Sequence, residues 1–153
     1  MEGSHTVSAT RIAITMAFVA GLCGAAQASV SGAMGLRIGS LQAAAFGSIV
    51  AAVLLVGLAL AVGDAPGIVE AVRQPPWLWI SGVFGALIVL AIAYAPPRIG
   101  TFATVAMLIA GQLIAGAAID AFGWLGTERI PVTASRVIGL VLLTAGAALT
   151  LRH

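Results

Sequence analysis

Six of the polar residues that lie within or beside long apolar stretches of this chain are the candidates for chemistry. They are Gln27, Ser31, Ser48, Tyr94, Gln112 and Asp120. Amides, hydroxyls and carboxylates find no water in the hydrocarbon of a bilayer, so they usually face protein or a water-filled cavity. We expect these residues to line such a cavity, where they could bind a polar solute.

The stretch 96–126 contains the clearest pattern. Between Arg98 and Asp120 lie 21 uncharged residues, and a bilayer crossing needs about 20. Gln112, Gly116 and Asp120 follow each other at steps of four, so they share one stripe of a helix. Asp120 would lie roughly 12 Å beyond Gln112 along the helix axis, near an interface rather than at the midplane.

Structural explanations of these groups stay open beside the functional one. Gln27 and Gln112 could each make an interhelical hydrogen bond that orders a helix bundle. Asp120 could be an interfacial carboxylate paired with an arginine, and the sequence offers Arg98, Arg129 and Arg136. The functional alternative is a polar cavity in which Asp120 binds a cation or a proton.

Composition indicates that these residues belong to an all-α integral membrane protein. Hydrophobic residues make up 61% and charged residues 8% of the chain, against roughly 25% charged residues in soluble domains. The uncharged stretches predict five transmembrane helices in one domain over residues 1–153, at about 11–34, 41–62, 77–95, 101–122 and 133–151. We expect a compact bundle rich in Gly and Ala, because small residues let membrane helices approach closely.

Two of the predicted helices have special features. Only 15 residues separate Arg136 from Arg152, so the last helix must begin before Arg136 or place that side chain at the interface. The first helix has a rival interpretation as a signal peptide, with Ala26-Gln27-Ala28 resembling a cleavage site. Apolar and small residues continue to Leu36, which favours a transmembrane helix.

The connections are short. Pro96-Pro97 predicts a tight turn over 95–100, because proline cannot continue a helix. Residues 63–76 form the longest link, in which apolar residues alternate with Glu70 and Arg73. This pattern predicts one helical turn at the membrane interface.

The distribution of arginine bears on orientation and partners. With five spans, one side of the membrane carries four of the seven arginines and the other side three, so the positive-inside rule barely favours a cytoplasmic N-terminus. Such a near-tie permits insertion in both orientations. We expect either a homodimer or a heterodimer with a related five-helix chain. The near-tie in the number of arginines would allow the homodimer to be antiparallel.

Several functional classes find no support in the sequence. The seven arginines are dispersed at predicted helix ends, without the basic aromatic patch that nucleic-acid binding requires. Histidine occurs only at positions 5 and 153, and Cys23 is the single cysteine. These residues provide neither a Ser-His-Asp set nor a metal site within the spans, so we expect no enzyme activity, no metal and no cofactor.

A family resemblance rests on motifs that run from about residue 12 to the end of the chain. The most specific lie in the third and fourth spans: Pro76-Trp77, Gly82, Gly85-Ala86, Pro97-Arg98-Ile99-Gly100, Gly111-Gln112-Leu113, Ile119-Asp120 and Phe122-Gly123. Arg136, Gly139 and Gly146 follow, while Gln27-Ala28, Arg37-Ile38-Gly39-Ser40 and Ser48 precede them. This pattern resembles the YdcZ-like branch of the drug/metabolite transporter superfamily.

The resemblance implies a small multi-pass protein of the inner membrane that acts as half of a transporter. Its solutes would be small and polar or amphipathic, and two five-helix units would act as a dimer. Ala25, Ser31 and Ile88 depart from residues common in the family, where Pro, Asn and Tyr occur. The alternative is an accessory subunit that does not transport and packs against a larger membrane protein.

Overall fold

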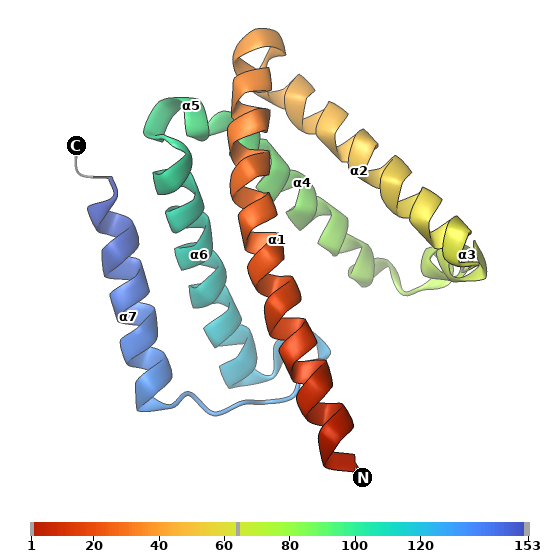
Figure 1. Cartoon of the computed structure of the whole chain (residues 1–153), viewed down its shortest axis with the longest axis vertical. Helices are drawn as coiled ribbons and strands as arrows, with labels where there is room; N and C mark the ends of the chain where they lie inside the picture. The colour runs from red at the N-terminus through yellow and green to blue at the C-terminus, as the bar shows by residue number, and fades with distance from the viewer. Residues whose placement is uncertain (1, 64, 152–153) are drawn as a thin grey trace. The chain divides into compact units, whose positions relative to one another are not determined.

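The computed structural model describes residues 2–63 and 65–151, and the secondary structure in these ranges is helical. In chain order, the elements are α1 (Glu2–Ile38), α2 (Ser40–Val62), α3 (Ala65–Arg73), η1 (Pro76–Trp79), α4 (Ile80–Tyr94), α5 (Pro96–Ile99), α6 (Thr101–Phe122), η2 (Trp124–Gly126) and α7 (Ala134–Leu149) (Figure 1). The all-helical class predicted from the sequence is confirmed.

Four helical segments are long and apolar enough to cross a membrane. They are Thr10–Ile38, Ser40–Val62, Pro76–Ile99 and Thr101–Phe122. The helix α7 is also apolar but has only 16 residues, which corresponds to about 24 Å against a hydrocarbon thickness of about 30 Å. Four of the five predicted spans therefore have membrane length, and the fifth stays a prediction.

The boundaries of the helices differ from the predictions at several points. The first helix extends to Ile38 rather than 34 and runs without a break through Ala26–Ala28. The predicted single turn in the 63–76 link is the nine-residue helix α3. The predicted tight turn at 95–100 contains a further short helix, α5, because a proline is well tolerated in the first turn of a helix.

The described residues fall into two compact units. One unit comprises residues 27–98, and we call it the α2–α4 unit. The other comprises residues 99–151 with the N-terminal part of α1, and we call it the α6–α7 unit. Each unit contains a pair of neighbouring helices that run in opposite directions (Figure 1).

The α2–α4 unit packs through small residues. Ala43, Ala44 and Ala93 form its core, and Met34, Val89 and Leu90 pack against them. The second half of α1 approaches so closely that a Cβ on Gly35 would lie 2.7 Å from the carbonyl oxygen of Ala93. Glycine at this position therefore allows a contact that a side chain would prevent.

Large apolar side chains point outwards throughout the described structure. The buried hydrophobic residues are Ala28, Ala43, Ala44, Ile92, Ala93, Ala103, Ala110 and Ala147. Exposed side chains include Leu54 at 67% and Phe102 at 77% exposure. A soluble protein would bury such residues, whereas lipid solvates them, so this pattern fits a protein whose helices contact each other through alanine and glycine.

Candidate functional site

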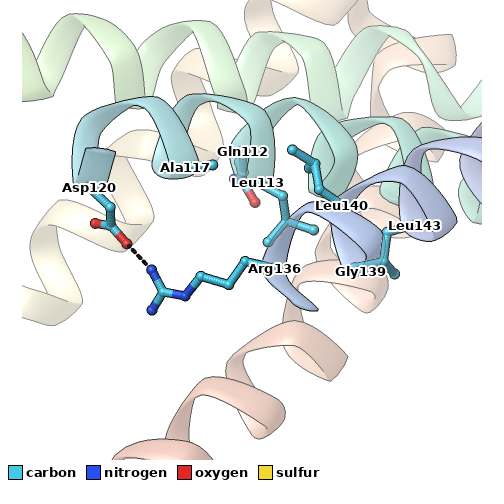
Figure 2. A pocket seen from close by; sticks show the side chains of 9 residues that line it. Gln112, Leu113, Ala117, Asp120, Arg136, Gly139, Leu140 and Leu143 are labelled. Carbon is cyan, nitrogen blue, oxygen red and sulfur yellow. Dashed lines mark hydrogen bonds and ion pairs between the residues drawn. The ribbon is translucent and has the colours of Figure 1, made fainter. Parts of the chain in front are cut away.

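A groove between α6 and α7 brings together the most polar stripe of the chain. It encloses about 380 Å³ and is lined by Gln112, Leu113, Gly116, Ala117, Asp120, Arg136, Gly139, Leu140 and Leu143 (Figure 2). The stripe of Gln112, Gly116 and Asp120 predicted from the sequence faces this groove. Its volume lies within the range of small-molecule sites in proteins, about 300–1,000 Å³.

Asp120 and Arg136 form an ion pair at one end of the groove. The guanidinium Nη1 of Arg136 lies 3.3 Å from the carboxylate Oδ2 of Asp120 (Figure 2). The two side chains are 49% and 36% exposed, respectively. Of the three arginines that the sequence offered as partners for Asp120, Arg136 is the one that contacts it.

The first turn of α7 positions Arg136. Thr133 precedes the helix in an extended conformation, and its hydroxyl oxygen accepts a hydrogen bond from the backbone N–H of Arg136 at 3.4 Å. Threonine is a favourable residue at this position because its hydroxyl satisfies an N–H that the helix leaves unpaired. The cap therefore defines where α7 begins and places Arg136 opposite the end of α6.

The segment after η2 makes two hydrogen bonds with the C-terminal end of α6, next to Asp120. The backbone N–H of Ile130 donates to the carbonyl oxygen of Asp120 at 2.9 Å. The Nε of Arg129 donates to the carbonyl oxygen of Ala121 at 2.9 Å. Both contacts satisfy carbonyls that the end of a helix leaves unpaired, so the second candidate arginine caps α6 and does not join the ion pair.

Arg98, the third candidate partner, contacts Tyr94 instead. Its guanidinium carbon lies 3.5 Å from the centre of the Tyr94 ring, a cation–π arrangement. The same side chain donates a hydrogen bond to the carbonyl oxygen of Tyr94. Tyr94 is 52% exposed, so the pair forms part of the surface where α4 ends.

Gln112 lies in the groove without a hydrogen-bonding partner for its side chain among residues 2–63 and 65–151. Its amide is exposed rather than engaged by a neighbouring helix of this chain. The interhelical hydrogen bond that was one of the two alternatives for Gln112 is therefore not formed within the described structure. The amide is available to a solute or to a second chain.

The remaining candidates lie in the α2–α4 unit, on α1, α2 and α4. Gln27 and Ser31 are on α1, where Gln27 is exposed and Ser31 half-buried. Ser48 lines a second groove of about 390 Å³ between α2 and α4, together with mostly apolar residues such as Leu41 and Leu87. Gln112 and Asp120 are thus the predicted site residues that one groove brings together.

The site residues predicted from the sequence do not include the α7 face of the groove. Arg136, Gly139, Leu140 and Leu143 line it, and their spacing of three and four residues is that of one helix face. This periodicity, with Arg136 as a charge complementary to Asp120, is the signal that could have identified them. The sequence does not show that α7 packs against α6.

Comparison with known protein families finds one match, which covers nearly the whole chain. The family model described as "Putative inner membrane exporter, YdcZ" matches residues 12–149. No curated protein and no solved structure matches the chain. The matched range contains all the described residues of the groove between α6 and α7.

Proposed function

The chain belongs to the YdcZ family of inner membrane exporters, and we propose that it moves small polar or amphipathic solutes along the groove between α6 and α7. Membership of this family and the four helices of membrane length make it a multi-pass membrane transporter of the inner membrane. The solute class and the path are our proposal. We also propose that the protein transports its solute without altering it chemically.

The composition of the groove supports this proposal. An ion pair and an unpaired amide lie along a cavity whose other lining residues are Leu, Ala and Gly. Polar groups are costly at membrane depth, so they usually mark the path of a solute or ion. The apolar wall would accept the body of an amphipathic solute, while Gln112 and the ion pair would hold its polar parts.

We further propose that two chains act together, either as an antiparallel homodimer or as a heterodimer with a related chain. The described residues bury few side chains, and the buried apolar ones are nearly all alanines. Many glycines on the helices, such as Gly82, Gly85 and Gly111, have open space beside them. Small residues of this kind allow a second set of helices to approach closely.

Flux measurements in proteoliposomes test the transport proposal. We expect a panel of anionic, cationic and zwitterionic solutes to reveal flux through the wild-type protein. Gln112→Ala should abolish this flux without lowering membrane abundance, because it removes the free amide from the groove. Gln42→Ala is the matched control, since Gln42 is an exposed amide on α2 outside this groove.

Two outcomes would contradict the proposal. Normal flux in the Gln112→Ala variant would show that the amide has only a structural role. Absence of flux for every solute in the panel would favour the accessory-subunit alternative, in which the chain stabilises a larger membrane protein.

A further inference from the structure

We propose that the solute is a single-chain amphiphile, whose polar head lies in the groove lined by Gln112, Asp120 and Arg136 and whose unbranched apolar chain lies in an adjoining groove of the same helix pair. We call these the polar groove and the apolar groove. This inference rests on the proposed function, because it names the class of solute that the same site would take. The head can carry either sign of charge or both, since the half-exposed ion pair presents a carboxylate and a guanidinium side by side.

The apolar groove lies between α6 and α7 and encloses about 340 Å³, which is within the range of small-molecule sites. Five residues of the segment 142–150 line it from the α7 side, and four line it from α6, namely Phe102, Val105, Ala106 and Ile109. Of these nine lining residues, Thr150 alone has a polar side chain, and its hydroxyl donates to the carbonyl oxygen of Ala147 at 2.7 Å. A solute in this groove would therefore contact hydrocarbon side chains.

The two grooves are continuous along both helices. Leu143 of α7 lines both of them. On α6, the lining residues follow each other at steps of three or four from Phe102 through Gln112 to Asp120, so they share one face of the helix. This face is about 27 Å long, close to the hydrocarbon thickness of about 30 Å. A single binding surface therefore runs along nearly the whole of α6.

Polar and apolar groups are separated along this surface. The amide of Gln112 and the Asp120–Arg136 pair lie in the half towards the end of α6. Phe102 lies about 15 Å from Gln112 along the axis, in the direction away from Asp120. A compact polar solute would fill the polar groove and leave the apolar groove without a ligand, whereas an amphiphile with an extended chain would fill both.

The α2–α4 unit contains a counterpart of the apolar groove but not of the polar one. Its groove of about 390 Å³ is lined from α2 by residues that follow Gly39 at the same intervals at which the four α6 residues follow Gly100, namely Leu41, Ala44, Ala45 and Ser48. Further along α2, the positions that correspond to the polar stripe of α6 hold apolar residues, namely Ala51, Leu55 and Ala59. A site for both head and chain is therefore built in the α6–α7 unit, and the α2–α4 groove provides an internal control.

Pairs of solutes that share one head and differ in chain length test the inference. Ethyl and octyl sulfonates, trimethylammoniums and sulfobetaines provide an anionic, a cationic and a zwitterionic pair for flux measurements in proteoliposomes. Each methylene moved from water into an apolar site raises affinity by roughly fourfold. In every pair that is transported, we therefore expect the octyl member to reach half-maximal flux at a concentration at least about tenfold lower than the ethyl member.

Variants that fill the apolar groove separate binding in the groove from partition into lipid. Ala106→Leu extends a side chain into the apolar groove and should remove most of the advantage of the octyl chain, while flux of the ethyl member stays close to that of the wild type. Ala45→Leu is the matched control, because Ala45 has the corresponding position in the α2–α4 groove, and it should leave the advantage unchanged. The lipid is the same in both cases, so partition into it cannot produce the difference.

A second variant tests the same groove from the α7 side. Gly146 lines the apolar groove, and a Cβ added there would have no atom within 4 Å. Gly146→Leu should therefore insert into the membrane normally and should also remove most of the advantage of the octyl chain. Its abundance in the membrane, compared with that of Ala106→Leu, shows whether a loss of flux reflects the groove or poor folding.

Three results would overturn the inference and leave the proposed transport function intact. They are equal half-saturating concentrations for the ethyl and octyl members of every transported pair, an undiminished preference for the octyl chain in both groove-filling variants, and an equal loss of preference in Ala45→Leu. Absence of flux for all the pairs and for every other solute would instead contradict the proposed function itself.

Discussion

Arg136 and Asp120 show how two helix ends create a polar site in an apolar protein. Each residue lies within about one turn of the end of its helix, and the two side chains meet at 3.3 Å. An ion pair exposed in this way adds little to stability, about 0–1 kcal/mol. Its value is therefore in the placement of two opposite charges at one end of the groove.

The N-cap of α7 should control this placement. Replacement Thr133→Ala removes the oxygen that accepts from the N–H of Arg136, and such a loss typically lowers the free energy of unfolding by about 1 kcal/mol. We expect a corresponding decrease in stability when the variant is unfolded in mixed detergent micelles. Thr133→Ser keeps the accepting oxygen and should retain most of the wild-type stability. Equal stability of the alanine and serine variants would contradict this role of the cap.

At the scale of elements, two helix junctions share one local structure. Gly39 follows Arg37-Ile38 and precedes α2, while Gly100 follows Arg98-Ile99 and precedes α6. Both glycines have positive φ, +95° and +81°, which side chains rarely tolerate. Each carbonyl accepts the N–H of the residue four positions on, Ala43 or Thr104, and both of these residues are buried.

The repeated Arg-Ile-Gly sequence therefore predicts where two of the long helices begin. The predicted starts at 41 and 101 agree with the observed starts at Ser40 and Thr101. The first helix ends at Ile38, four residues later than the sequence predicts. Its extension to Ile38 depends on its packing in the α2–α4 unit, where Gly32 and Gly35 lie close to Pro96 and Ala93.

Glycine at position 35 should be essential for this packing. In Gly35→Ala the added Cβ would lie 2.7 Å from the backbone oxygen of Ala93, which cannot move without shifting α4. We expect a loss of about 1–3 kcal/mol in the free energy of unfolding. The control is Gly24→Ala on the same helix, where no atom lies within 4 Å and alanine is the better helix former. Similar losses in the two variants would show that close packing is not the cause.

At the scale of the whole molecule, the short length of α7 bears on whether a second chain is needed. The four helices of membrane length and the shorter α7 agree with the five predicted spans in order and position. If α7 also crosses the membrane, its 16 residues are shorter than the hydrocarbon layer. The bilayer must then be thinner locally, or another chain must shield the ends of this helix from lipid. A second five-helix unit would provide such cover and would complete a transporter with two halves.

The topology prediction can be tested with reporters fused to the C-terminus. With five spans and four arginines against three, we expect reporters specific for each side of the membrane to be active in separate populations. Arg37→Ala removes one arginine from the side with three and should shift the population towards one orientation. Activity on one side only, in the wild-type chain, would exclude an antiparallel homodimer. Cross-linking to a related chain would then be the test of a heterodimer.

The class of this protein, the long helices and the stripe of Gln112, Gly116 and Asp120 could all be predicted from the sequence. This is possible because composition and periodicity are local properties: apolar length decides what can cross a bilayer, and a spacing of four decides what shares a helix face. The identity of Arg136 as the partner of Asp120 could not be predicted from the sequence and comes from the packing of the helices, while Arg98 and Arg129 have other contacts. That choice depends on which helices pack together, and side chains 16 residues apart meet only after α7 has folded back along α6.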